Sequence, residues 1–326
     1  MKLLYFTDSH LRVTNPKNRT DDFYQTLKNK MNEILEISLE EDVDYILHGG
    51  DLFDRPDTPI SLVTDFSQIF QKFKSPIYIV SGNHDIFGHN PSTVHRTMFG
   101  LLDSLGVIKM ITDKVILKKD VTVQLTSFPY TIDMDNPHNR EGYIVRDKGN
   151  ADYAIHLTHG FLIDKKPPEM IPHTLISDIT DTVADVTFGG HIHYGFKTLN
   201  VDGKYFINPG SIVRISNSLS EFKRKPKIVI LELTDEINVR EINLKTALPA
   251  EEVLDRSEIE HHKFKTQQFN DFKSTIESSS NLRSFDVFDI LVDIAKNENI
   301  SKEVRDEAIR RVESKQIEGA DYNWFI

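Results

Sequence analysis

The stretch Tyr45-Ile46-Leu47-His48-Gly49-Gly50-Asp51-Leu52-Phe53-Asp54 carries the pattern that decides the fold. A short apolar run predicts a buried strand, two glycines allow a sharp turn, and a carboxylate follows at the turn. Because glycine has no Cβ, other groups can approach Asp51 closely. Ligands of open α/β sheets gather at the carboxyl ends of the strands, so Asp51 stands where chemistry is expected.

Four further segments also read as strands that end in polar side chains. These apolar, β-prone segments span residues 2–7, 76–80, 153–158 and 183–188. The side chains that follow them are Asp8 and His10; Asn83, His84 and Asp85; His159; and His191 and His193. One such cluster alone is more often a turn than a site. Five strand ends with oxygen or imidazole donors predict one shared site.

The segments between these strands predict an α/β fold. Residues 22–40 have apolar side chains at helical spacing, and residues 61–73 and 97–105 also read as helices. The β-α-β order predicts parallel strand pairs with right-handed crossovers. Two antiparallel pairs are expected as well, 115–117 with 121–128 and 227–233 with 237–244.

The character of the chain changes near Thr246, where strands give way to helical patterns. Helices are expected over residues 250–262, 267–277, 285–296 and 302–314. We therefore predict two domains, residues 1–245 and residues 246–326. The second is expected to be a helical appendage that caps the first domain or binds a partner.

Composition narrows the functional classes. The absence of cysteine excludes disulfides, thiolate metal sites and cysteine nucleophiles, and favours a cytoplasmic protein. No apolar run approaches the roughly 20 residues that span a membrane. Asp and Glu number 50 against 39 Lys and Arg, a formal net charge of −11. A polyanionic substrate would then need local positive charge, from bound metal or from a small basic patch.

The donor types in the five clusters predict the kind of metal. Carboxylate, carboxamide and imidazole without thiolate suit manganese, iron or zinc in a mixed nitrogen and oxygen site. The donors outnumber what a single ion needs. A carboxylate shared by two ions about 3.5–4 Å apart is a common arrangement for the hydrolysis of phosphate esters.

The motif order resembles that of the calcineurin-like metallophosphoesterase superfamily. The motifs are Asp8-x-His10, Gly50-Asp51, Gly82-Asn83-His84-Asp85, His159-Gly160 and Gly190-His191-x-His193, and they span about the first 240 residues. The resemblance implies an α/β fold in which a β-sandwich is flanked by helices, here with the C-terminal helical appendage added. It also implies a two-metal phosphodiesterase.

The resemblance also implies a role for each matching residue. One ion would be held by Asp8, His10, Asp51 and His193, and the other by Asp51, Asn83, His159 and His191. His84 would contact the phosphate and protonate the leaving oxygen, and Asp85 would orient His84. The implied metal is Mn²⁺, with Fe²⁺, Zn²⁺ and Mg²⁺ as alternatives.

Residues 50–56 and 81–85 look most like SbcD-type DNA repair nuclease subunits. That resemblance implies a manganese-dependent DNA exonuclease or endonuclease in repair, recombination or replication. It further implies an SbcC-type coiled-coil ATPase as partner, and a homodimer. Eukaryotic relatives have a histidine where this chain has Asp54, which favours a bacterial or phage-like branch.

Two alternatives stay open. Asn208-Pro209-Gly210-Ser211 is also similar to general phosphodiesterases of the superfamily, and the same centre could serve a phosphatase acting on a small molecule or a phosphoprotein. The chain could instead be a binding module with a vestigial centre, although every expected ligand is intact. The helical tail of about 80 residues favours the nuclease.

Overall fold

The computed structural model describes the chain except residues 168–170, 262–264, 268–291, 293, 297–299 and 321–326. The chain divides into two compact units, Met1–Arg256 and Ser257–Ile326. The boundary between these units follows Arg256, whereas the domain division after residue 245 stays a prediction.

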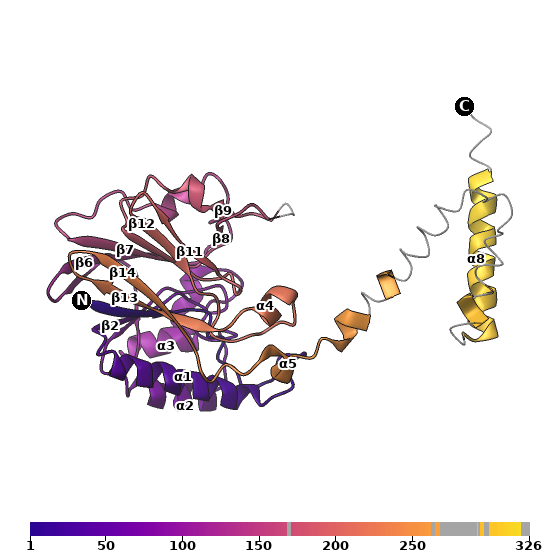
Figure 1. The fold of residues 1–326 in the computed structure, drawn as a ribbon, viewed down its shortest axis with the longest axis horizontal. Coiled ribbons are helices and arrows are strands. Elements are labelled where there is room, and N and C mark those ends of the chain that lie inside the picture. The colour runs from indigo at the N-terminus through magenta and orange to yellow at the C-terminus, as the bar shows by residue number, and fades with distance from the viewer. Residues whose placement is uncertain (168–170, 262–264, 268–291, 293, 297–299, 321–326) are drawn as a thin grey trace. The chain divides into compact units, whose positions relative to one another are not determined.

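Two six-stranded sheets form the centre of the first unit (Figure 1). The first has the order β14-β13-β1-β2-β3-β4, with β1 (Lys2–Phe6), β2 (Tyr45–His48), β3 (Ile77–Ile79), β4 (Lys109–Met110), β13 (Lys227–Leu233) and β14 (Ile237–Asn243). The second has the order β11-β12-β10-β7-β6-β5, with β5 (Val115–Lys118), β6 (Thr122–Phe128), β7 (Tyr153–Thr158), β10 (Val186–Gly189), β11 (Phe196–Val201) and β12 (Lys204–Asn208). Short strands β8 (Leu162–Ile163) and β9 (Thr174–Leu175) pair separately.

The strands that precede the polar clusters run parallel. Leu4 of β1 lies opposite Ile46 of β2, which in turn lies opposite Ile77 of β3. In the second sheet, Leu157 of β7 lies opposite Phe188 of β10. Because parallel strands end at the same edge, each sheet gathers its polar clusters at one edge. Both expected antiparallel pairs, β5 with β6 and β13 with β14, are confirmed.

Helices cover the first sheet on one face (Figure 1). They are α1 (Phe23–Glu40), α2 (Ile60–Phe70) and α3 (Met98–Ser104), close to the expected ranges. Asp22 caps α1 by accepting a hydrogen bond of 3.0 Å from the backbone N–H of Gln25. Short 3₁₀ helices span Pro91–Arg96, Arg140–Tyr143 and Ile176–Asp178. Helix α4 (Leu219–Lys223) follows the last strand of the second sheet along the chain. Helix α5 (Ala250–Val253) lies shortly before the end of the first unit.

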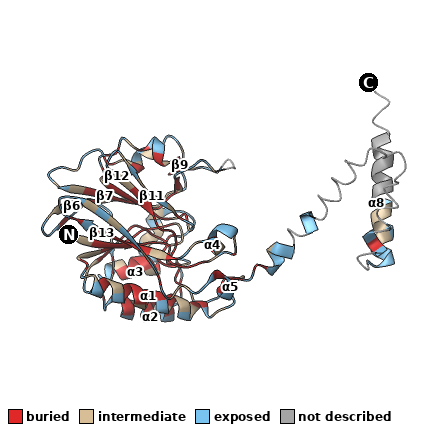
Figure 2. Ribbon diagram, viewed as in Figure 1, coloured by how far each residue is buried: buried red, intermediate tan, exposed pale blue. Residues whose placement is uncertain are grey.

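Strand β1 is apolar on both faces because it lies between two cores. Leu4 and Phe6 pack with the helices, whereas Leu3 and Tyr5 pack between the sheets. Side chains of a strand alternate between its faces, so one strand serves both layers. The Tyr5 ring stacks on Phe188 of the second sheet with centroids 4.1 Å apart. Figure 2 shows the buried residues concentrated along these sheets and the inner sides of the helices.

The C-terminal part differs from expectation in one described place. The helix expected over residues 250–262 is interrupted after Val253, where Leu254 forms a β-bridge with Arg19, and residues 257–261 are helical again. Helix α8 (Lys302–Ala320) contains the helix expected over residues 302–314. The helix expected over 267–277, apart from its first residue, and most of 285–296 lie outside the described residues. Among the helices that are described, none is both long and apolar enough to span a bilayer.

Candidate metal centre

The residues named from the sequence come together where the two sheets meet at their carboxyl edges. Loops after β1, β2 and β3 carry donors from the first sheet, and loops after β7 and β10 carry donors from the second. All seven expected ligands are among them: Asp8, His10, Asp51, Asn83, His159, His191 and His193. Residues distant in the chain therefore converge on one place.

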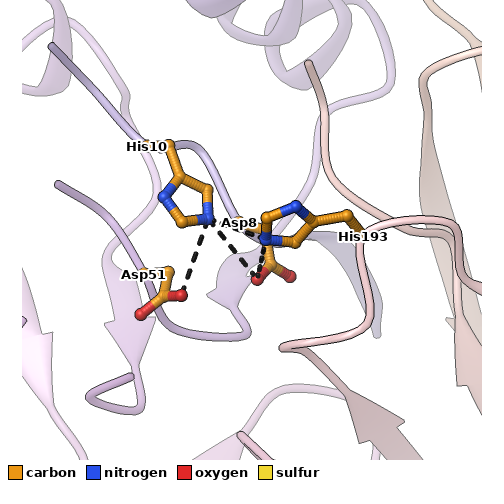
Figure 3. A group of neighbouring side chains, drawn as sticks. All are labelled: Asp8, His10, Asp51 and His193. Atoms are coloured by element: carbon orange, nitrogen blue, oxygen red, sulfur yellow. Dashed lines mark hydrogen bonds and ion pairs between the residues drawn. The ribbon is translucent and has the colours of Figure 1, made fainter. Parts of the chain in front are cut away.

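A first group of donors consists of Asp8, His10, Asp51 and His193, whose ligand atoms all lie within 4.8 Å of one another (Figure 3). His10 Nε2 lies 3.6 Å from Asp51 Oδ2 and 3.0 Å from His193 Nε2. His193 Nε2 is 3.7 Å from Asp8 Oδ1. Two imidazole nitrogens and two carboxylates thus face a common point.

A second group consists of Asp51, His159 and His191, again within 4.8 Å. His159 Nε2 lies 3.3 Å from Asp51 Oδ2. The carboxamide oxygen of Asn83 lies 3.2 Å from His159 Nε2 and 2.9 Å from His191 Nδ1. Asp51 belongs to both groups, so its carboxylate is the side chain that they share.

Four of these donors have a left-handed backbone. The φ angles are 52° at Asp8, 43° at His10, 53° at Asp51 and 70° at His191. Residues other than glycine adopt this region at a cost of about 1–3 kcal/mol each, and such residues cluster at functional sites. Backbone hydrogen bonds hold the turns: Asp8 N–H donates to Gly50 O at 3.1 Å, and His10 N–H to Asp51 O at 3.0 Å.

Two glycines make room for Asp51 and its neighbours, and one of them, Gly50, lies in the opening motif, which predicted this role. A Cβ on Gly50 would stand 2.3 Å from Nδ1 of His159, and Gly50 also has a φ of +99°. A Cβ on Gly82 would stand 2.2 Å from Oδ1 of Asp51. Any side chain at either position would displace a donor.

Asp85 has a different partner from the one expected. Its buried carboxylate accepts backbone N–H groups from Asp51 (2.9 Å), Leu52 (3.1 Å) and Gly82 (2.9 Å). The group on Nδ1 of His84 is instead the backbone carbonyl of Asp54, at 2.7 Å. Asp85 thus fixes the two turns that carry Asp51 and Asn83, and the carbonyl of Asp54 orients His84.

Asp54 is the neighbour that sequence reasoning did not place at the site. Its Oδ1 lies 3.6 Å from His10 Nδ1, just beyond hydrogen-bond distance, and Arg12 pairs with its Oδ2 at 2.9 Å. Asp54, His10 and His84 form a third group of donors within 4.8 Å. The available signal was its position three residues after Asp51 on the same turn.

Burial and charge act against each other at the centre. Burial opposes ionisation of Asp51, but His159 and His10 outweigh it and hold the pKa of Asp51 well below its usual range. Burial lowers the pKa of His159, but Asp51 and Asp8 raise it to about 9. Burial, with the charge of Asp51 contributing, raises the pKa of Asp8. Two buried carboxylates so close together require positive charge between them.

The donor set fits divalent cations. Oxygen and imidazole donors without thiolate match a mixed site for manganese, iron or zinc. The imidazoles of His10 and His193 approach through ring nitrogens, which are the atoms that bind metals. The two groups joined by Asp51 have the composition of two neighbouring cation sites.

Other polar residues near the centre have structural roles. His156 lies in the core between Thr126 Oγ1 (2.8 Å) and Gly142 O (3.0 Å). In the 208–211 turn, Asn208 Nδ2 donates to Ile192 O at 3.3 Å, and Ser211 Oγ donates to Asp8 O at 2.7 Å. This turn supports the loops that carry the donors.

Comparison with known proteins agrees with this geometry. The family model for calcineurin-like phosphoesterases matches residues 1–195. The DNA double-strand break repair protein Mre11 of Methanococcus maripaludis is 26% identical over 339 residues, which covers 99% of this chain and 85% of that protein. The Mre11 protein of Archaeoglobus fulgidus is 24% identical over 66% of this chain and 50% of its own length.

Among solved structures, the calcineurin-like phosphoesterase YfkN from Bacillus subtilis aligns with 83% of this chain and 97% of that chain. Its TM-score is 0.47 and its sequence identity 15%. The assignment therefore rests on the family model and on the donor groups. The chain belongs to the calcineurin-like phosphoesterase family and is a metal-dependent phosphoesterase.

Proposed function

We propose that this chain is a DNA nuclease that uses two divalent ions, Mn²⁺ first among them, and that it acts in DNA repair, recombination or replication. The observation that carries the proposal is the pair of donor groups that share Asp51. The Mre11 relative that covers 99% of the chain supports DNA as the substrate.

The ligand roles are part of this proposal. Asp8, His10, Asp51 and His193 would hold one ion, and Asp51, Asn83, His159 and His191 the other. When bound, two divalent ions supply Lewis acidity that offsets charge on the phosphodiester and lowers the pKa of water. The protein fixes the donors in advance, through strained turns that are held by backbone hydrogen bonds.

His84 is the proposed proton donor to the leaving oxygen. Its Nδ1–H donates to the carbonyl of Asp54 at 2.7 Å, and the ring would act as an imidazolium whose second proton, on Nε2, is the one given to the leaving oxygen. The ring lies edge-on to His10 with centroids 4.7 Å apart, which places it beside the first donor group. The backbone N–H of His84 donates to Asp51 Oδ1 at 2.8 Å and couples its position to the shared carboxylate.

Partners follow from the same proposal. Residues 246–326 would form the partner-binding region, with an SbcC-type coiled-coil ATPase as partner. A homodimer would use the helical side of the first unit, where the large apolar side chains of Ile60 (71% exposed) and Leu105 (67% exposed) reach the surface.

The test is cleavage of labelled single-stranded and duplex DNA by the purified chain with Mn²⁺, with and without the ATPase. We expect cleavage that requires the metal and falls sharply in the His84→Gln variant. Hydrolysis of p-nitrophenyl phosphate far faster than any DNA cleavage would contradict the nuclease and indicate a phosphatase. No cleavage under any of these conditions would also contradict it.

A further inference from the structure

A cleft of about 550 Å³ lies between two segments of the first unit. One wall is formed by the end of α4 and the residues just after it, and the other by residues 243–251. Its lining includes five cationic side chains, Arg214, Lys223, Arg224, Lys225 and Lys245, and one carboxylate, Glu251. We call this the basic cleft. In a chain with a net charge of −11, such a local excess of positive charge needs an explanation.

The two arginines of the basic cleft are fixed in place. Arg214 is buried, and it donates to Leu248 O at 2.8 Å and to Glu221 O at 3.1 Å. Arg224 pairs with Glu221 at 2.7 Å and donates to Ser211 O at 2.6 Å. In these hydrogen bonds Arg214 donates to carbonyl groups rather than to a carboxylate, so the bonds do not neutralise its positive charge.

The three lysines of the cleft are exposed: Lys223, Lys225 and Lys245. Across the described parts of the chain, their ammonium groups have no ion pair and no hydrogen bond. Lysine carries a mobile point charge, which suits contact with phosphate groups that are not held in one fixed geometry. These side chains are therefore available to an anionic ligand.

A buried lysine interacts with these arginines. Lys30 of α1 is 2% exposed, and its Nζ has no hydrogen-bond partner. Burial lowers the pKa of Lys30 to about 7; Glu33 opposes this, and Arg214, Arg19 and Arg224 add to the lowering. The repulsion indicates that the guanidinium groups of these arginines lie near Lys30.

The basic cleft is linked to the metal centre through two hydrogen bonds. Arg224 donates to the carbonyl of Ser211, and the hydroxyl of Ser211 donates to the carbonyl of Asp8 at 2.7 Å. Figure 1 shows α4 on the side of the first unit toward which β1 runs, and Asp8 follows β1. A polymer bound at the metal centre can thus extend along this side of the first unit to the basic cleft.

We propose that the basic cleft binds the sugar-phosphate backbone of the nucleic acid whose phosphodiester is hydrolysed at the metal centre. This inference rests on the proposed nuclease function. Contacts to phosphate position a nucleic acid without reading its sequence, and lysines are suited to that task. An acidic protein that acts on a polyanion needs a local positive track, because its overall field is repulsive. A shared substrate favours nucleic acid over an acidic peptide.

The test compares two triple variants of the full chain with the same change in net charge. Lys223→Gln, Lys225→Gln and Lys245→Gln together alter the cleft. Lys72→Gln, Lys74→Gln and Lys114→Gln together are the control, since these lysines are exposed, lack ion pairs among the described residues and do not line the cleft. Binding of a labelled DNA strand is measured in EDTA against KCl concentration.

For the cleft variant we expect at least a tenfold loss of affinity. The slope of log affinity against log salt should become shallower by about 2 to 3, roughly one for each phosphate contact removed. Hydrolysis of bis(p-nitrophenyl) phosphate with Mn²⁺ should stay at the parent rate, because this small diester reaches only the metal centre. The control variant should bind DNA within about twofold of the parent.

Equal losses in both variants, or no loss in the cleft variant, would overturn the proposal. So would a loss of binding to polyglutamate with unchanged DNA binding, which would indicate an acidic peptide ligand. The nuclease proposal is judged separately. A parent chain that binds DNA through the cleft but never cuts it would contradict only the nuclease, and a cutting enzyme whose cleft variant binds normally would contradict only the cleft.

Discussion

The two sheets contribute unequally to the metal centre. The first sheet supplies both carboxylates, Asp8 and Asp51, which are almost fully buried. Its loops are tied to each other by backbone hydrogen bonds, such as His10 N–H to Asp51 O at 3.0 Å. The second sheet supplies imidazoles, and two of them are attached to the first sheet rather than to each other.

Those attachments are specific. The backbone N–H of His191 donates to Asp8 Oδ1 at 3.1 Å, and His159 Nδ1 lies 2.7 Å from Gly49 O. The first sheet therefore forms a charged frame, and the second sheet adds donors that are held against it. Loss of a first-sheet carboxylate should therefore dismantle the centre, whereas loss of a second-sheet imidazole should remove only part of it.

The largest effect is expected for Asp51→Asn. Asparagine tolerates the positive φ at this position, so the turn should survive while the shared negative charge is lost. We expect loss of both ions and a fall in activity of about 10³-fold or more, because both donor groups include this carboxylate. Metal content by mass spectrometry of the native protein is the measurement.

His191→Asn is the matched variant from the second sheet. Asparagine also tolerates the positive φ at position 191, and the His191 side chain belongs to only one donor group. We expect one ion to remain. If Asp51→Asn keeps two ions, or if both variants lose the same number of ions, the two sheets do not differ in their contribution to metal binding.

His84→Gln should separate chemistry from assembly. The ring donates a proton in the proposed mechanism, and it is absent from the two donor groups that share Asp51. We expect both ions to remain and kcat to fall about 10²–10⁴-fold with little change in KM. Steady-state kinetics at saturating Mn²⁺ give this result, and a loss of metal in this variant would argue that His84 is a ligand.

Asp54→Asn should weaken metal binding without removing the proton donor. Its carboxylate lies near His10 Nδ1, while its backbone carbonyl, which holds His84, is unchanged by the substitution. We expect metal affinity to fall about 10–100-fold, as for other groups that orient a ligand. Calorimetric titration with Mn²⁺ measures the affinity. A kcat near that of the parent at saturating metal is expected, and a large loss of kcat would contradict this role.

The smallest effect on activity is expected at His156, which lies in the second sheet away from the donors. Burial lowers the pKa of His156 to about 4, so the folded state stays neutral while the unfolded state takes up a proton below about pH 6.5. The unfolded state then binds more protons, and the free energy of unfolding falls by about 1.4 kcal/mol for each pH unit from 6.5 toward 4.

Urea unfolding of the metal-free protein measures this dependence. In the His156→Gln variant the titrating group is gone, so its stability should fall less between pH 6.5 and pH 4.5 than that of the parent. Parallel curves for the two proteins would show that His156 does not contribute. The comparison isolates the acid sensitivity of the second sheet from that of the ligands.

Much of this arrangement could be predicted from local sequence. The predicted bounds of strand β7 match the observed ones. An apolar run defines the strand, and His159-Gly160 directly after it marks its end. The gathering of donors followed from parallel order alone. Strand β11 was not predicted, although Asp202-Gly203 after it signals a hairpin and both residues have positive φ, 51° and 84°.

The missed features depend on contacts between distant segments. The target of Asp85 is a set of N–H groups on another turn, which no spacing rule specifies. The break after Val253 arises because Leu254 pairs with Arg19, far away in the chain. Local pattern identified the donors, and tertiary contacts decided which groups orient them.

The left-handed backbone at four donor positions restricts how this centre can diverge. A β-branched residue at Asp8, His10, Asp51 or His191 would disturb the loop as well as delete a donor. Descendants that abandon catalysis but keep the fold should therefore favour asparagine or glycine at these four places. An inactive member of this lineage would therefore keep residues that tolerate positive φ at these positions, even after its metal ligands had been lost.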